Sequence, residues 1–285
     1  MINLLDGKGY VKVVLVSPDD VPVIPGDTEI RTRDYIIAKA ARTSTGGDLK
    51  SVKEDRNLIK YLYRHKHTSP FEMASVTFEI KCPIAIGRQF LRHRTGKFNE
   101  FSQRYSHVGE DIGRFDITTP TSLRGQSKMN AQSSEDNLPP EASGKILEKL
   151  QEVESKLDEI YKDYNTLIEL GLAREVARFC LPLSTYTVIY IQFDLNNLCK
   201  FLSLRMAPDA QYEIRVYAEA MFKLTKEYFP IVMEAFEEEM EKIVLDKWAV
   251  DMIREGRISK EVKSKSLRSR LEELALKLKI KLNLT

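Results

Sequence analysis

The sequence predicts a fold of the α/β (α+β) class, in which a β-sheet is flanked by helices. Residues 10–17 and 186–193 are rich in β-branched or aromatic residues, and apolar and polar residues alternate over 76–80, as is typical of strands. Long stretches between and after these strands repeat apolar residues at helical spacing. With 285 residues, the chain is long enough for one large domain or two small ones.

In chain order, a proline-containing loop at 17–27 follows the first strand, and a helix at 35–42 ends in polar residues that suit a cap. The tetrapeptide Ser69-Pro70-Phe71-Glu72 fits a capping box with proline at the first helical position. Another helix begins at Pro83. The further predicted helices are residues 54–64, 146–170, 194–204, 209–227 and 230–243.

Two segments differ from the rest of the chain. Residues 118–143 are dominated by Ser, Pro, Asn, Gln and Gly without periodicity, so we expect a flexible surface loop that carries no chemistry. From residue 246 to the end the sequence is helical in pattern and rich in charge, which favours a solvated helical hairpin over an interaction tail. We therefore expect a domain at 1–245, with 118–143 as an insertion, and a C-terminal extension at 246–285.

The overall composition excludes little but favours a cytoplasmic protein. Lys and Arg number 44 against 42 Asp and Glu, and a net charge of +2 gives no global argument for nucleic-acid binding. No apolar run is long enough to span a membrane, and residues 1–16 carry charges that do not suit a secretory leader. The three cysteines, Cys82, Cys180 and Cys199, have no Cys-x-x-Cys spacing and suggest reduced, buried thiols.

The most informative stretch is 92–105, Arg-His-Arg-Thr-Gly-Lys-Phe-Asn-Glu-Phe-Ser-Gln-Arg-Tyr. So many donors close together form either a solvated basic surface or a site that binds an anion, because burying them unpaired costs about 1–3 kcal/mol per neutral group and more if charged. In the preceding helix, Gln89, Arg92 and His93 share the face opposite the apolar one, and a loop at Gly96 follows. A rigid polar face next to a loop favours a site, and an ordinary amphipathic surface helix is the alternative.

This stretch resembles the signature of the flavin-dependent thymidylate synthases, Arg-His-Arg-x-x-Ser-x-Asn-Glu-x-Ser-x-Arg-Tyr. It meets every fixed position except the first Ser, where Lys97 stands. The resemblance covers most of residues 10–237 apart from 118–143, and it implies a mixed or antiparallel sheet flanked by helices. It also implies a homotetramer whose active sites are shared between chains. The chain departs from the family at Asp194 and Lys200, where Asn is common, and at Asp209, where His is common.

The resemblance also implies the site residues. Those expected to bind the substrate dUMP are Gln89, Arg92, Glu100, Ser102, Gln103 (through its backbone), Arg104, Arg178 and Arg205. Those expected to bind FAD are Ser44, His67, Ser69, Arg92, His93, Arg94, Glu100, Asp194, Asn196 and Lys200.

The implied reaction is the reductive methylation of dUMP to dTMP, with methylenetetrahydrofolate as one-carbon donor and FAD reduced by NADPH. Arg suits a phosphate dianion through its bidentate fork, so Arg104 and Arg178, with Ser102, are expected to bind the phosphate. Arg205 is the expected catalytic cation, because a positive charge beside the uracil ring stabilises negative charge that develops there. Ser102 is the second candidate catalytic residue: it is the hydroxyl of the signature best placed to attack C6 of the ring, but no base is adjacent to it in the sequence, and phosphate binding accounts for it. No side chain supplies hydride, so a redox cofactor is required, and the chain lacks Gly-x-Gly-x-x-Gly to bind it in a Rossmann turn.

Three other interpretations compete with this one. A nucleic-acid-binding protein using 92–104 is opposed by Glu100 within the basic stretch and by the near-neutral chain. A synthase with Cys180 as nucleophile is opposed by the absence of an adjacent His or Lys, and a buried thiol fits better. A zinc site at His65 and His67 lacks further ligands with suitable spacing, so no metal is expected.

Overall fold

The computed structural model describes residues 1–24, 29–105, 112–128, 134–135, 138–240, 250–252, 271–272 and 275. The chain divides into two compact units, 1–239 and 240–285. The few described residues of the second unit are helical. Most of the predicted C-terminal extension lies outside the described residues, as do 241–249, so the domain boundary at 245 stays a prediction.

The first unit is built on a five-stranded sheet, in the order β1-β2-β3-β7-β4, and every described pairing in it is antiparallel. The three predicted strands are confirmed as β2 (Gly9–Ser17), β3 (Ser75–Pro83) and β7 (Tyr186–Asp194). The sequence did not indicate the two edge strands, β1 (Ile2–Leu4) and β4 (Lys97–Glu100). The predicted fold class is confirmed as an antiparallel sheet flanked by helices.

The helices predicted within the described residues are present with different ends, and the predicted end of the last of them, 241–243, lies outside those residues. The described helices of the first unit are α1 (Tyr35–Thr43), α2 (Val52–Arg64), α3 (Ile84–Phe90), α4 (Pro140–Glu169), α5 (Arg174–Ala177), α6 (Leu195–Arg205), α7 (Tyr212–Lys226) and α8 (Pro230–Met240). Short 3₁₀ turns are η1 (Ser69–Met73), η2 (Pro120–Ser122) and η3 (Arg178–Cys180).

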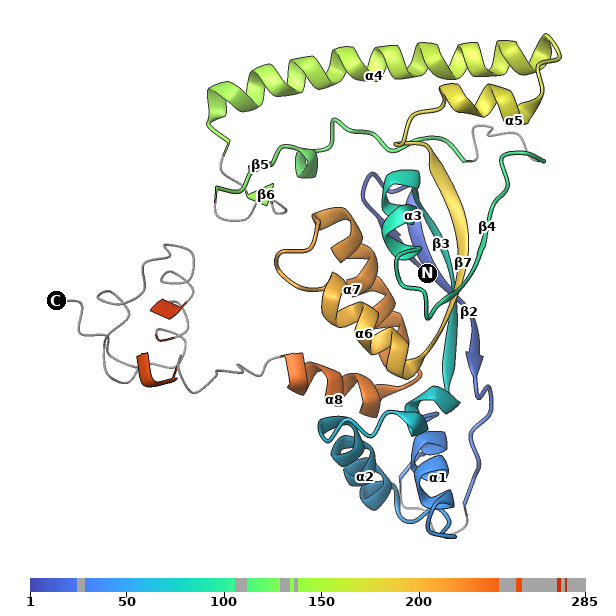
Figure 1. Ribbon diagram of the computed structural model, residues 1–285, viewed down its shortest axis with the longest axis vertical. Helices are drawn as coiled ribbons and strands as arrows, with labels where there is room; N and C mark the ends of the chain where they lie inside the picture. The colour runs from blue at the N-terminus through green and yellow to red at the C-terminus, as the bar shows by residue number, and fades with distance from the viewer. Residues whose placement is uncertain are drawn as a thin grey trace. The chain divides into compact units, whose positions relative to one another are not determined.

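One face of the sheet is covered by α3, α6 and α7 (Figure 1). Along β3, buried and partly exposed residues alternate, as expected for a strand with one face in the core. Stacked rings join the layers: Phe201 of α6 lies 5.3 Å from Phe90 of α3 and 5.5 Å from Phe193 of β7, measured between ring centroids. This aromatic core fixes α3, which directly precedes the signature stretch, against α6, which carries Arg205.

The segment expected to be a structureless loop, 118–143, is structured in its described part. It contains η2 and a two-stranded sheet of β5 (Gly125–Gln126) and β6 (Ser134–Glu135). Helix α4 begins at Pro140 and not at 146, because Pro140 suits the first turn of a helix and Glu141 favours the N-terminal end of the helix dipole. The prediction of a loop through residue 143 was therefore wrong.

Candidate active site

The signature stretch turns away from α3 earlier than the sequence predicted. We expected Gln89, Arg92 and His93 to share a helix face, but α3 ends at Phe90 and a turn leads into β4. At Gly96 an added Cβ atom would come within 2.7 Å of the rings of Phe193 and Phe98, so only glycine fits this close approach. As a result His93 folds back toward α6, whereas Arg92 is exposed to solvent.

Arg205, at the end of α6, is the centre of a polar cluster with Gln89 and His93. Its Nε donates a hydrogen bond to His93 Nε2 at 3.0 Å. Its Nη1 and Nη2 donate to the side-chain and backbone oxygens of Gln89 at 3.5 and 3.4 Å. Residues far apart in the sequence, from α3, the turn after it and α6, are thus brought together.

Electrostatics in this cluster follow from partial burial. Burial lowers the pKa of Arg205, because desolvation disfavours the cation. Burial also lowers the pKa of His93, and the neighbouring charge of Arg205 adds to that effect. The neutral imidazole is therefore favoured, which agrees with its role as hydrogen-bond acceptor from Arg205. No carboxylate is bonded to the Arg205 guanidinium in the part of the chain that the structure describes.

Sequence reasoning missed Gln211, Glu213 and Arg124, which extend this cluster. Gln89 Nε2 donates to Gln211 Oε1 at 2.6 Å, and Gln211 Nε2 donates to Glu213 Oε2 at 2.8 Å. Glu213 is buried and pairs with Arg124 at 2.5 Å. Gln211 and Glu213 lie at the start of α7, where polar residues are common as caps, so the local pattern gave no signal of a site.

The expected phosphate residues gather where α5 approaches the end of the signature stretch. Arg104 pairs with Glu175 of α5 at 3.0 Å, and both side chains are about half exposed, at 54% and 53%. Ser102 Oγ accepts a hydrogen bond from the backbone N–H of Arg104 at 3.3 Å. Arg178 begins η3 directly after α5 and has no recorded side-chain partner among the described residues.

Glu100 and Gln103 continue the same edge of the sheet. Glu100 ends β4 opposite Ile189, and its Oε1 accepts a hydrogen bond from Thr187 Oγ1 at 2.8 Å. Gln103 is half-buried in the turn that follows. The predicted substrate residues therefore form two groups in one chain, one around Arg205 and one around Arg104, with Glu100 on the edge strand.

The expected flavin residues of the N-terminal part lie on exposed loops after α1 and α2. Ser44 Oγ donates to the backbone oxygen of Ala41 at 2.8 Å, which supports the helix-end interpretation of this residue. The ring of His67 stacks on Tyr61 with centroids 6.4 Å apart. Ser69 is exposed at the start of η1.

The capping box predicted at residues 69–72 is wrong. The 3₁₀ turn η1 is preceded by Thr68, and no side chain caps it. Glu72 Oε1 instead accepts a hydrogen bond from Asn196 Nδ2 at 3.1 Å. A partner 124 residues away in the sequence has displaced the local contact, and it ties η1 to the start of α6.

The remaining flavin candidates surround α6. Asp194, one departure from the family, caps α6 by accepting from the backbone N–H of Asn197 at 2.8 Å and from its side chain at 2.6 Å. Asn196 is buried, whereas Lys200 and Asp209 are exposed.

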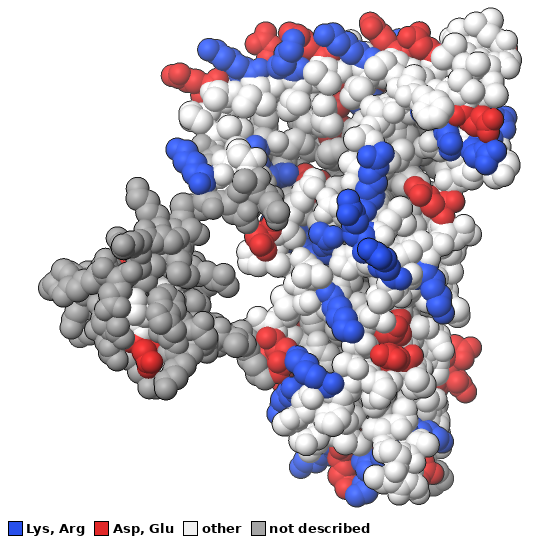
Figure 2. Space-filling model, in the orientation of Figure 1, with Lys and Arg blue, Asp and Glu red and all other residues white. Residues whose placement is uncertain are grey.

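Basic side chains offer a setting for an anionic cofactor. Arg92, Arg94 and Lys200 are exposed, and none has a recorded side-chain partner among the described residues. Figure 2 shows Lys and Arg side chains gathered over the middle of one face, where α3 and β4 lie in Figure 1. Such donors fit the pyrophosphate of FAD. Over the same described residues no group of His, Cys, Asp and Glu side chains could hold a metal ion.

The cysteines are only partly as expected. Cys82 and Cys199 are buried, and burial raises the pKa of both thiols, that of Cys199 to about 12. Cys180 is exposed, so the prediction of a buried thiol there was wrong. It lies in η3, and its Sγ donates to the backbone oxygen of Ala177 at 3.0 Å. Partial desolvation raises the pKa of this thiol, which does not suit a nucleophile.

Comparison with known proteins identifies the class to which this fold and site belong. A family model described as "Thymidylate synthase complementing protein" matches residues 28–231. The flavin-dependent thymidylate synthase of Thermus thermophilus is 44% identical over 269 residues, which cover 94% of this chain and 90% of the relative. The enzyme of the same name from Dictyostelium discoideum is 43% identical over 227 residues, covering 79% and 73%.

A solved structure agrees with these relatives. The UMP/dUMP methylase of Streptomyces cacaoi, bound with 5-Br dUMP, superimposes with a TM-score of 0.65 at 31% identity and covers 81% of this chain and 95% of its own. The chain therefore belongs to the thymidylate synthase complementing protein family, whose curated members among these relatives are flavin-dependent thymidylate synthases. None of the helices in the described residues is long and apolar enough to cross a membrane.

Proposed function

We propose that this protein is a flavin-dependent thymidylate synthase, a methyltransferase that converts dUMP to dTMP with FAD as its flavin. The family assignment supports the activity, and the flavin follows from the names of the relatives. The observation that carries the proposal is the convergence of Gln89, His93 and Arg205 in a chain with the family's signature. The alternative of a nucleic-acid-binding protein has no separate observation in its favour.

In the proposed complex the nucleotide phosphate binds between Arg104 and Arg178. Ser102 and the backbone at Gln103 contribute further polar contacts, and Gln89, Arg92 and Glu100 contact sugar and base. Arg178 is available to an anion, and Arg104 is available once it leaves Glu175. The Ser102 hydroxyl accepts from the backbone N–H of Arg104 and contacts no general base among the described residues, so it fits phosphate binding better than nucleophilic attack.

Arg205 is the proposed catalytic residue. Its charge is partly desolvated and held by His93 and Gln89, and no carboxylate of the described residues is bonded to it, so it can stabilise negative charge that builds on the uracil ring. The neutral His93 fixes the guanidinium plane by accepting from Nε. When bound, reduced FAD supplies the hydride that no side chain can provide.

The finer parts of the proposal concern the flavin residues, the co-substrates and the assembly. The residues proposed to bind FAD are Ser44, His67, Ser69, Arg92, His93, Arg94, Glu100, Asp194, Asn196 and Lys200. Methylenetetrahydrofolate is proposed as one-carbon donor and NADPH as reductant, which reduces FAD.

A homotetramer with shared sites is supported by apolar side chains that this chain leaves exposed beside the phosphate residues. Phe179 is 82% exposed and Leu170 79% exposed, and both flank α5. Apolar surface of this kind is typical of an interface, and a second copy of the chain would cover it next to Arg104 and Arg178.

The test is an assay of dUMP methylation with FAD, NADPH and methylenetetrahydrofolate, each omitted in turn. We expect a yellow protein with flavin absorbance bands and dTMP formed only in the complete mixture. Formation of dTMP by flavin-free protein, or no dTMP from flavin-loaded protein in the complete mixture, would contradict the proposal.

A further inference from the structure

Four side chains form a hydrogen-bonded series that ends at the proposed substrate site. We name Arg124, Glu213, Gln211 and Gln89, in this order, the amide relay. Arg124 Nη2 donates to Glu213 Oε1 at 2.5 Å, and Glu213 Oε2 accepts from Gln211 Nε2 at 2.8 Å. Gln211 Oε1 then accepts from Gln89 Nε2 at 2.6 Å. The amide relay joins the 112–128 segment, the start of α7 and α3.

The orientation of both glutamines follows from the chemistry of Glu213. A carboxylate accepts hydrogen bonds but does not donate them, so the amide group that faces it must present its NH₂. Gln211 therefore directs Nε2 to Glu213 and Oε1 to Gln89. Gln89 in turn must direct its own Nε2 to Gln211, which leaves Oε1 on the side of Arg205, 3.5 Å from Nη1.

The far end of the amide relay is firmly held. Glu213 is buried, and the guanidinium of Arg124 lies 4.9 Å from the centroid of the Tyr212 ring. Gln211 is the residue that precedes the first turn of α7, so its backbone is fixed by the helix. A rotation of the Gln211 amide would set its oxygen against the Glu213 carboxylate, which is unfavourable because Glu213 is buried.

We propose that the amide relay makes this enzyme specific for uracil against cytosine, by presenting Gln89 Oε1 as an acceptor to the base. Uracil carries a hydrogen on N3 and can donate to this oxygen, whereas cytosine has a bare N3 lone pair that repels it. The proposal deepens the proposed function, because it depends on the nucleotide base lying beside Gln89 and Arg205. Gln211, Glu213 and Arg124 are positioning residues, since they act through Gln89.

The sharpest variant is Glu213→Gln. Its amide oxygen still accepts from Arg124, so its NH₂ turns to Gln211 and both following amides reverse. Gln89 then gives up its weak 3.5 Å hydrogen bond from Arg205 Nη1 and presents NH₂ to the base, which suits N3 of cytosine and opposes N3–H of uracil. We expect the dissociation constant for dUMP to rise and that for dCMP to fall, so that their ratio changes by about 10- to 100-fold.

Two further variants make the experiment decisive. Gln211→Ala, at an exposed position, frees the Gln89 amide and should reduce the preference for dUMP without favouring dCMP. Glu219→Gln lies on the same α7, removes the same charge outside the amide relay and should keep the wild-type ratio. All proteins are titrated calorimetrically with dUMP and with dCMP, and a thermal melt of each records whether it is folded.

The outcomes separate the two proposals. Wild-type protein that binds no dUMP contradicts the proposed function. A second outcome would overturn the amide relay. In it, wild-type protein binds dUMP, but folded Glu213→Gln and Gln211→Ala proteins keep the ratio of the dissociation constants for dUMP and dCMP within about threefold of the wild-type ratio. If Glu213→Gln does not fold, Gln211→Ala decides alone: a ratio reduced by about tenfold supports the proposal and an unchanged ratio refutes it.

Discussion

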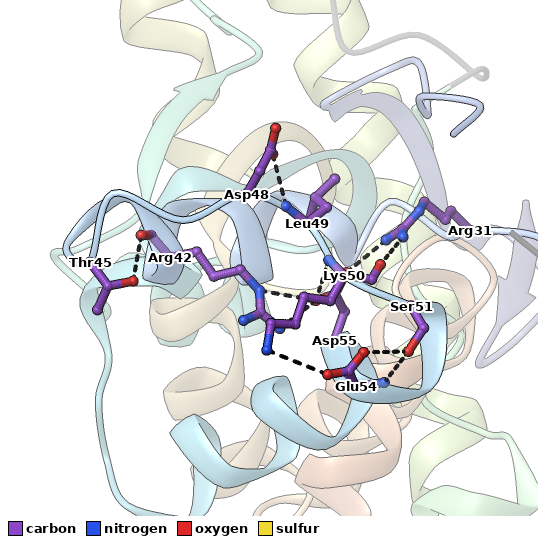
Figure 3. A network of polar contacts seen from close by, with 9 residues as sticks. All are labelled: Arg31, Arg42, Thr45, Asp48, Leu49, Lys50, Ser51, Glu54 and Asp55. Carbon is purple, nitrogen blue, oxygen red and sulfur yellow. Dashed lines mark hydrogen bonds and ion pairs between the residues drawn. The ribbon is translucent and has the colours of Figure 1, made fainter. Parts of the chain in front are cut away.

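Replacing Asp55 should destabilise the protein more than any exposed charge does. Asp55, in α2, accepts from Arg31 Nη1 at 2.8 Å and from Arg42 at 3.1 and 2.7 Å (Figure 3). The backbone N–H of Lys50 donates to the same carboxylate at 3.3 Å. The carboxylate is 4% exposed, and the two guanidiniums are 3% and 15% exposed. Asp55→Asn keeps the shape of the side chain but removes the negative charge that Arg31 and Arg42 share.

The magnitude follows from that burial. Removing one partner of a buried ion pair typically costs about 3–5 kcal/mol, because the remaining charge is buried and unpaired. For a unit of this size each kcal/mol lowers the melting temperature by about 2–4 °C, so a fall of about 6–20 °C is expected. The matched control is Glu54→Gln, one residue earlier on the same helix, where the pair with Lys50 at 3.5 Å is exposed and screened by water, so its loss should change stability little.

The assay is thermal and urea unfolding of wild type and both variants at one pH. A second measurement is flavin affinity, because Asp55 also fixes the loop between α1 and α2 that carries Ser44. Equal melting temperatures for Asp55→Asn and Glu54→Gln would refute the reasoning, since they would show that the buried carboxylate stabilises the protein no more than an exposed one does.

Four other outcomes are expected. Arg104→Ala and Arg178→Ala should weaken dUMP binding by about 10- to 100-fold but deoxyuridine binding little, and equal calorimetric losses for both ligands would count against phosphate contact. Cys180→Ala should keep turnover, and a folded but inactive variant would return the thiol to the mechanism. The pKa of His93 is lowered in the folded protein, so the unfolded chain binds more protons at acidic pH. The neutral imidazole therefore contributes its full stability above about pH 6.5, and this contribution is lost as the pH falls below that value. His93→Gln should flatten this acid loss in urea unfolding, and an unchanged slope would contradict it. Arg205→Ala should lower kcat and kcat/KM together by about 10²–10³-fold, with KM little changed. Reduction of the flavin by NADPH should stay intact in this variant. Methylation of dUMP by this variant at the wild-type rate would remove Arg205 from the mechanism.

Local pattern was sufficient for the elements with a regular period. The strands β2, β3 and β7 alternate or are rich in β-branched residues, and the helices repeat apolar residues, so both were predicted. The strand β4 was missed because charged residues of the signature stretch hide any alternation. The start of α4 was missed because its first turn contains Pro, Ser and Gly, which are typical of loops.

The arrangement of the site depends on contacts between residues that are distant in the sequence, and no local pattern predicts such contacts. Gln89 and Gln211 are 122 residues apart, and Arg205 and His93 are 112 apart. The resemblance to a family predicted that Arg205 belongs to the site, but it said nothing of Gln211 or Glu213. Physical periodicity alone would have assigned these polar residues at the start of a helix to capping.

The pairing of Arg104 with Glu175 is compatible with a phosphate site and does not argue against one. An ion pair that is about half exposed contributes at most about 1 kcal/mol, since water screens the charges and two long side chains lose freedom. A phosphate dianion offers the same guanidinium a second charge and more acceptor oxygens, so it displaces the carboxylate at little cost. Until then Glu175 keeps Arg104 beside α5, the helix that leads directly to Arg178. Glu175→Gln removes the carboxylate that the phosphate must displace, so it should tighten dUMP binding slightly in calorimetry. Weaker binding by this variant would contradict this competition.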